Sequence, residues 1–307
     1  MVYVGAPANA RTNEFVYDGG VTSHRVKALR QAHPEYTGAG VKVGILSDSI
    51  SLDFLAQATG NLPPNIYVLN GAQGWGLSEG AAMAELIYNM APNATLYFAT
   101  AFGSDGTYAH NIMELAAAGC KVIVDNIFYF QEPVFEDGII AQAVQMVANQ
   151  GVLYFSAAGN EGNTFFKTST TWEGDYVPAH WTTFTANLSS SYLDVHAFSY
   201  EHTYNTITGT PTYVTLHWSD PYYEAFADYD LFIFDANGTL VTFSATNSIA
   251  YEIADMYYLP FGTYNVVVAR YFGPVRAISL RFCEYPFSCC CLLLFVVVVS
   301  SSPLPAE

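Results

Sequence analysis

The stretch "GLSEGAAMAELIYNMAPNATLYFATAF", residues 76–102, contains a helix, a turn and a strand in direct succession. Residues 79–89 carry apolar side chains at helical spacing, and Pro92 marks the turn that follows them. Residues 94–100 are a short, largely apolar run, which is typical of a strand buried on both faces. The stretch therefore predicts a sheet of parallel strands covered by helices.

The same alternation continues on both sides of this stretch. Further strands are expected at residues 41–49, 65–70, 121–130 and 152–160, and further helices at residues 23–34, 107–119 and 137–151. Strands of roughly five to seven residues that alternate with helices of roughly 11 to 14 residues indicate crossover units. We therefore expect an α/β fold with a doubly wound, mostly parallel sheet over residues 36–162.

The pattern changes after Gly162. Thr, Tyr, Phe and Val alternate with polar residues at 212–220, 228–245, 251–259 and 262–273, and "DANGTL" at 235–240 is a hairpin signal. This half predicts a β-sandwich of the jelly-roll type, either an insertion or an accessory domain. The expected domains are an N-terminal extension (1–35), the α/β domain (36–165), the β-sandwich (166–283) and an aberrant tail (284–307).

Composition and charge limit the class of protein. Hydrophobic residues make up 51% of the 307 positions, which suffices for a large core. The net charge of −17 repels a phosphate backbone, so we exclude nucleic acid as the main partner. The first 20 residues show no signal or transit peptide, which leaves the cellular location open. The apolar run at 287–299 is shorter than the roughly 17 to 25 residues that cross a bilayer, so we expect no membrane span.

Asp48, Glu79 and Asn160 stand where open α/β sheets usually place their chemistry. "YTGAGVKVGILSDSI", residues 36–50, resembles the strand that carries the catalytic Asp of subtilisin-like serine peptidases. "GVLYFSAAGNEG", residues 151–162, resembles the strand and loop that carry their oxyanion-hole Asn. Between them, residues 79–102 are similar to the helix of the catalytic His and to the A-P-N-A segment and strand that follow it.

The resemblance implies a subtilisin-like α/β domain and a polypeptide substrate. It assigns Asp48 as the orienting acid, Glu79 as the general base in the position of the usual His, and Asn160 as the oxyanion donor. The related sedolisins also use a Glu as base, together with an Asp one helical turn later, where this chain has Met83. An unperturbed Glu has a pKa of about 4.3, so burial and the charge of Asp48 must raise it, and we expect an acidic pH optimum.

The nucleophile is missing from this pattern. Family members carry it in a G-T-S-x-A-x-P segment, and nothing in residues 163–307 matches that segment. If the β-rich half is an insertion, the serine helix is expected beyond residue 283, where the unusual tail stands instead. We therefore expect a serine endopeptidase of the subtilisin-like family that is truncated and inactive alone. The alternative is a non-catalytic pseudo-peptidase or a binding module that uses the aromatic β-sandwich. Most relatives are exported, which is only a prior for this chain.

Each candidate residue also has a purely structural interpretation. Asp48 can be a strand-end cap, Glu79 a helix-start acid that favours the local dipole, and Asn160 a turn residue. Met83, Leu86, Ile87 and Met90 are expected as a core stripe, and Asp125 and Asn126 are assigned a structural role by default. The seven histidines show no metal-ligand spacing, and we expect no cofactor. Calcium at Asp228, Asp230 and Asp235 is a weaker hypothesis than solvated hairpin acids.

Overall fold

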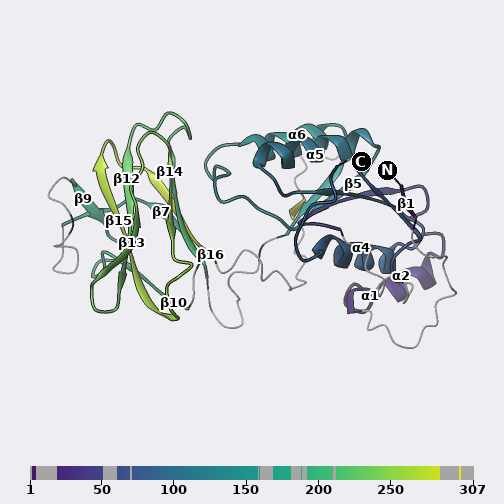
Figure 1. The fold of residues 1–307 in the computed structure, drawn as a ribbon, viewed down its shortest axis with the longest axis horizontal. Coiled ribbons are helices and arrows are strands. Elements are labelled where there is room, and N and C mark those ends of the chain that lie inside the picture. Colours follow the sequence, from purple (N-terminus) through teal and green to yellow (C-terminus); the bar gives the residue numbers. More distant parts are fainter. Residues whose placement is uncertain are drawn as a thin grey trace. The chain divides into compact units, whose positions relative to one another are not determined.

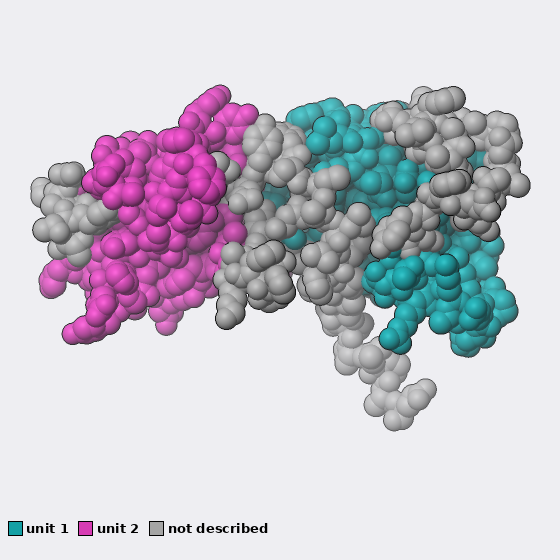
Figure 2. Space-filling model, turned by 90° about the horizontal axis from the view of Figure 1, so that it is seen from below, with its two compact units in different colours: residues 1–129, 138–159, 290–307 teal, residues 130–137, 160–289 magenta. Residues whose placement is uncertain are grey.

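The structure is a computed structural model, and it describes residues 2–4, 19–50, 61–69, 71–157, 159, 169–180, 188, 192–209, 212–283 and 297–298. The chain divides into two compact units, which Figure 2 shows in teal and magenta. The first unit comprises residues 1–129, 138–159 and 290–307, and the second comprises residues 130–137 and 160–289. The expected domain limits at 35, 165 and 283 stay predictions.

A seven-stranded sheet forms the middle of the first unit, in the order β1-β3-β4-β2-β5-β6-β17. Its strands are β1 (Val2–Val4), β2 (Lys42–Ser47), β3 (Asn65–Val68), β4 (Thr95–Thr100), β5 (Val122–Asp125), β6 (Leu153–Ser156) and β17 (Val297–Val298). The five strands from β3 to β6 pair in parallel, whereas β1 and β17 pair antiparallel at the two edges. The expected parallel sheet is thus confirmed, and its last edge strand comes from the stretch expected as a tail.

Helices cover both faces of this sheet. They are α1 (Gly19–Ser23), α2 (Val26–Ala32), α4 (Glu79–Met90), α5 (Asp105–Ala117) and α6 (Ile139–Asn149). In Figure 1, α5 and α6 lie on one side of the sheet, and α4 lies on the other side with α1 and α2. None of the described helices is long and apolar enough to span a bilayer.

The two hydrophobic cores of the first unit follow from the alternation of side chains along the strands. Leu46 of β2 packs in the core beneath α5 and α6, while the preceding Ile45 packs in the core beneath α4. Both side chains are fully buried, as is expected for the central strand of a sheet covered on both faces. The apolar run that predicted β2 is therefore explained by burial on both sides.

The start of α4 lies very close to the sheet. The N–H of Gly80 donates to the Ser49 carbonyl at 3.1 Å, just beyond the end of β2. A Cβ at Gly80 would lie 2.3 Å from Phe98 Cε2 and 2.6 Å from the Ser49 carbonyl oxygen. Glycine at position 80 is therefore a packing requirement that brings Glu79 to the edge of the sheet.

The second unit contains only antiparallel pairings among its described strands. The strands are β7 (Thr171–Asp175), β8 (Pro178–Ala179), β9 (Asp194–His196), β10 (Asn205–Gly209), β11 (Tyr213–Trp218), β12 (Asp228–Asp235), β13 (Leu240–Ser244), β14 (Tyr251–Asp255), β15 (Gly262–Phe272) and β16 (Ala277–Cys283). A six-stranded sheet has the order β13-β12-β15-β9-β8, with β10 also paired to β15, and a four-stranded sheet has the order β14-β11-β16-β7.

Both sheets of the second unit contribute to one hydrophobic core. Leu216 and Leu280 come from the four-stranded sheet, and Leu231 and Val266 come from the six-stranded sheet. The expected hairpin is present, because β12 and β13 pair antiparallel on either side of the turn. The structure therefore confirms an α/β protein with one parallel sheet and separate antiparallel sheets.

Residues 130–137 belong to the second unit although both flanking segments belong to the first. His217 Nε2 lies 3.0 Å from the Phe130 carbonyl oxygen, and the N–H of Tyr222 donates to Glu136 Oε1 at 3.0 Å. The rings of Phe130 and Tyr213 are 5.2 Å apart. The sequence did not predict this segment's association, because every one of these contacts joins residues more than 80 positions apart.

The substitution Gly80→Ala tests the packing of α4 against the sheet. We expect a loss of about 1 to 3 kcal/mol in the free energy of unfolding, because the new Cβ meets backbone and ring atoms that cannot easily move. Gly106→Ala in the first turn of α5 is the matched control. Its Cβ would lie 3.6 Å from Ser104 Oγ, so we expect a gain of roughly 0.5 to 1 kcal/mol. Urea unfolding of both variants gives the comparison, and equal effects would contradict it.

Candidate active site

The Asp48 carboxylate ties the end of β2 to the start of α4. Asp48 directly follows β2 and is only 4% exposed. Its Oδ1 accepts the N–H of Ser49 at 2.5 Å and of Glu79 at 2.9 Å, and its Oδ2 accepts the N–H of Leu77 at 2.6 Å. The first N–H groups of a helix need acceptors, and the preceding Ser78 makes no side-chain cap. Asp48 supplies these acceptors from a distant part of the chain.

The loop before α4 wraps closely around this carboxylate. Gly74 and Gly76 have φ values of 72° and 145°, which favour glycine. A Cβ at Gly76 would lie 2.3 Å from Asp48 Oδ2, and a Cβ at Gly74 would lie 2.0 Å from the Asp48 carbonyl oxygen. Both glycines are therefore required for the loop to approach Asp48.

Glu79 is the first residue of α4 and is partly buried beside Asp48. Burial raises the pKa of Glu79, the negative charge of Asp48 raises it further, and a hydrogen bond from Asn126 lowers it. Among the described residues, Asp48 is hydrogen-bonded to backbone N–H groups and the Ser47 hydroxyl rather than to the Glu79 carboxylate. The two acids thus interact through their charges, and their roles as orienter and base stay predictions.

Asn126 is a site residue that the sequence analysis left structural by default. It follows β5, and its Nδ2 donates to Glu79 Oε2 at 2.8 Å. Because β2 and β5 are parallel neighbours with Leu46 opposite Asp125, the residues after the two strands lie at one edge of the sheet. Side chains alternate along a strand, so Asn126 shares a face with Val124, which packs in the core beneath α4. This alternation is the sequence signal that assigns Asn126 to the site.

Asp125 points to the opposite face of the sheet and is 3% exposed. Tyr154 donates its hydroxyl to Asp125 Oδ2 at 2.5 Å, and Ser156 donates its hydroxyl to Oδ1 at 2.7 Å. Burial raises the pKa of Asp125 to about 6, although these hydroxyl hydrogen bonds lower it. The bonds join the ends of β5 and β6 and so fix the backbone from which Asn126 projects.

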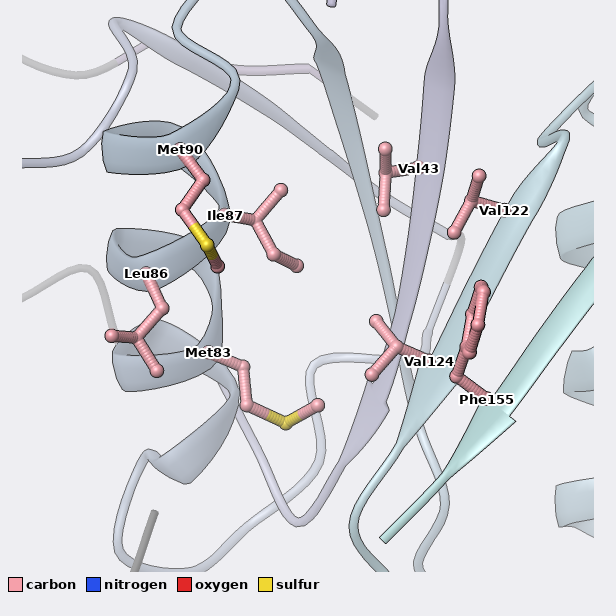
Figure 3. Close-up of a pocket in the computed structure, with 8 residues that line it drawn as sticks. All are labelled: Val43, Met83, Leu86, Ile87, Met90, Val122, Val124 and Phe155. Carbon is pink, nitrogen blue, oxygen red and sulfur yellow. The ribbon is translucent and has the colours of Figure 1, made fainter. Parts of the chain in front are cut away.

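An apolar cavity of about 250 Å³ lies between α4 and the sheet. Its lining residues, all labelled in Figure 3, are Val43, Met83, Leu86, Ile87, Met90, Val122, Val124 and Phe155. The four α4 side chains among them are those that the sequence analysis expects as a core stripe. Met83, which the resemblance places at the position of the sedolisin acid, extends toward Val124 in Figure 3. The face of α4 that lines the cavity is therefore apolar in this chain.

The remaining residues that the sequence analysis named are Asn160 and three acids of the second unit. Asn160 lies outside the described residues, and its oxyanion role stays a prediction. Asp235 Oδ1 accepts the N–H groups of Asn237 and Thr239 within the hairpin turn, at 2.9 Å and 2.8 Å. Asp230 accepts the hydroxyl of Tyr192 instead. No group of three or more His, Cys, Asp or Glu side chains that could hold a metal ion occurs among the described residues. Calcium at Asp228, Asp230 and Asp235 stays an untested prediction.

No family model and no curated protein matches this chain. Several solved structures match it. The CspB protease of Clostridium perfringens is 10% identical with a TM-score of 0.44, covering 85% of this chain and 66% of that chain. A lanthipeptide protease is 21% identical (TM-score 0.37; 52% of this chain and 51% of that chain), and the PatG macrocyclase, solved in complex with a peptide, is 14% identical (TM-score 0.32; 46% and 57%).

The structural neighbours are subtilisin-like proteases. This is the family that the sequence resembles. The chain spans about half to two thirds of the length of the three structures described above. All TM-scores lie below 0.5, so the geometry around Glu79 and not these likenesses carries the functional conclusion.

Removing the Asp48 carboxylate tests its role as the acceptor for the start of α4. We expect Asp48→Ala to lower the free energy of unfolding by about 3 kcal/mol, since the partly buried N–H groups of Leu77 and Glu79 lose their acceptors. Asp105→Ala removes an exposed acid from the first turn of α5 and should cost less than about 1 kcal/mol. Urea unfolding at pH 7 measures both, and a similar small loss for Asp48→Ala would refute the role.

The raised pKa of Asp125 predicts a pH dependence of stability. Its pKa of about 6 in the folded protein exceeds the ordinary value of 3.8, so the folded state binds more protons between these values. The contribution of Asp125 to stability is therefore full below about pH 4 and falls as the pH rises to 6, by roughly 3 kcal/mol. The variant Asp125→Asn removes this titration.

The measurement is urea unfolding at steps from pH 4 to pH 7, compared between Asp125→Asn and the parent chain. The difference between the two curves is the relevant quantity, because burial also raises the pKa of Asp230 and Glu252 in the second unit. Parallel curves across this range would show that Asp125 does not titrate as expected.

Proposed function

We propose that this chain carries the site of a serine-type endopeptidase of the subtilisin-like family, which hydrolyses peptide bonds. Glu79 acts as the general base toward the nucleophilic hydroxyl, and Asp48 holds the start of α4 so that the base stays in place. Asn160 donates to the oxyanion of the tetrahedral intermediate, as the resemblance implies. The substrate is a polypeptide bound along the carboxyl edge of the parallel sheet.

The observation that supports this proposal best is the environment of Glu79. Burial and the charge of Asp48 raise the pKa of Glu79 at the edge of a parallel sheet, where α/β proteins usually bind their ligands. A base is most effective when its pKa lies near the working pH, so the raised pKa suits Glu79 to proton transfer under mildly acidic conditions. A simple helix-start acid needs neither a buried neighbouring carboxylate nor a side-chain donor.

We further infer that the two antiparallel sheets of the second unit form a β-sandwich of the jelly-roll type. The shared core, to which Leu216 and Val266 contribute from different sheets, supports this inference. In the proposed protein this unit is an insertion or an accessory domain of the peptidase.

A second candidate is a pseudo-peptidase that binds peptides without cleaving them. The observation in its favour is the absence of a G-T-S-x-A-x-P segment from residues 163–307. Both candidates use the same peptide-binding edge, so hydrolysis and binding must be measured separately.

The substitution Glu79→Gln separates the two candidates. If Glu79 is the base, a longer form of the protein that includes a G-T-S-x-A-x-P segment cleaves internally quenched peptides with an optimum on the acidic side of neutrality. Glu79→Gln should lower kcat by at least about 100-fold, because the amide cannot accept the proton. Glu85→Gln is the matched control, since Glu85 is on the same helix and burial also raises its pKa. It should retain the parent activity.

Cleavage that survives Glu79→Gln, or a profile that peaks above about pH 8, contradicts the assignment of the base. Binding of the peptides without cleavage by this longer form, measured by fluorescence anisotropy, favours the pseudo-peptidase. Neither cleavage nor binding overturns both candidates.

A further inference from the structure

The amide of Asn126 uses only one of its two ends among the described residues. Its Nδ2 donates to Glu79 Oε2 at 2.8 Å, whereas its Oδ1 is buried and receives no hydrogen bond there. A buried acceptor without a donor costs about 1 to 3 kcal/mol, and such groups in native proteins call for an explanation. The unpaired Oδ1 lies in the same amide that contacts the proposed base.

The chemistry of the two side chains offers that explanation. An ionised carboxylate only accepts hydrogen bonds, so it needs the Nδ2 end of the amide. A protonated carboxyl group has an O–H to donate, and the Oδ1 end of the amide can accept it. No described residue donates to Oδ1. The side-chain amide of Asn126 can therefore rotate so that Nδ2 and Oδ1 exchange positions, without breaking a hydrogen bond other than the one to Glu79 in this part of the chain.

The surroundings of Glu79 favour an exchange between these two states. Asp48, after β2, faces Glu79 with a negative charge, and burial also favours the neutral carboxyl form. On β5 the neighbouring acid Asp125 is turned to the other face, toward Tyr154 and Ser156. Asn126 is thus the side chain from β5 that meets Glu79, on a backbone held by the bonds of Asp125.

We propose that Asn126 is the positioning residue of Glu79 and that its side-chain amide rotates when Glu79 gains or loses a proton. Its amide donates Nδ2–H to the ionised carboxylate and presents Oδ1 to the protonated carboxyl group. Glu79 is therefore held in one place whether or not it carries the proton. The inference rests on the proposed function, in which Glu79 takes a proton from the nucleophile and returns it to the leaving amine in each turnover.

The test is a titration of the Glu79 carboxyl carbon by NMR in the full chain. Asn126→Leu removes both hydrogen bonds at nearly constant volume. The midpoint should rise by about 0.5 to 1 pH unit, because the bond that the ionised form loses is charge-assisted and stronger than the one that the protonated form loses. Asn126→Asp adds a second charge beside Glu79 and should raise the midpoint further. Asn149→Leu is the matched control: Asn149 lies at the end of α6 and pairs with Gln145, so the midpoint of Glu79 should not change.

A purely structural Asn126 would lower the unfolding temperature of Asn126→Leu and leave the Glu79 midpoint unchanged. That result would overturn the proposal. If the variant does not fold, a pH titration of the parent chain still tests the proposal. The side-chain amide resonances of Asn126 should shift with pH at the same midpoint as the Glu79 carboxyl carbon, and a pH-independent Asn126 amide is the opposing result.

This titration does not depend on hydrolysis. Raised midpoints in a form that includes a serine segment and still cleaves no peptide would leave the role of Asn126 standing and count against the proposed function. Peptide cleavage, together with a Glu79 midpoint that does not change when Asn126 is substituted, would support the proposed function and overturn the role of Asn126.

Discussion

The arrangement of the first unit depends on one buried carboxylate. Asp48 accepts backbone N–H groups from the loop and first residue of α4, and these bonds hold the start of that helix against the end of β2. The negative charge lies at the helix end where backbone N–H groups carry partial positive charge, so the contact is favourable in both hydrogen bonding and electrostatics. The glycines at 74, 76 and 80 are consequences of this close approach.

The site has a polar edge above an apolar interior. Glu79 and Asn126 meet at the end of the parallel strands, while the α4 side chains that follow line an apolar cavity with Val124 and Phe155. Burial is the largest cause of the raised pKa of Glu79. Asp48 therefore has two effects: it positions the helix start, and its charge favours the protonated form of Glu79.

Much of the first unit follows from local patterns. The short apolar runs predicted β2, β3, β4, β5 and β6, and helical spacing predicted α4, α5 and α6 at close to their observed bounds. The sequence predicted less of the candidate site than of the fold. The sequence analysis did not foresee the hydrogen bond from Asn126 to Glu79, because strand register decides which of two neighbouring polar residues faces α4. A shift of one residue would have exchanged them.

The sequence by itself determined the order of helices and strands, the change from a parallel to an antiparallel half, and Glu79 as the first residue of its helix. These properties are local, because they depend on the period of apolar residues and on turn chemistry. Only the tertiary structure decided that Asp48 supplies acceptors to α4, that Asn126 holds Glu79, and that residues 130–137 belong with the second half of the chain. Each of these contacts joins residues roughly 30 to 90 positions apart, and a hydrogen bond over such a separation exists only once strand pairing has fixed both partners.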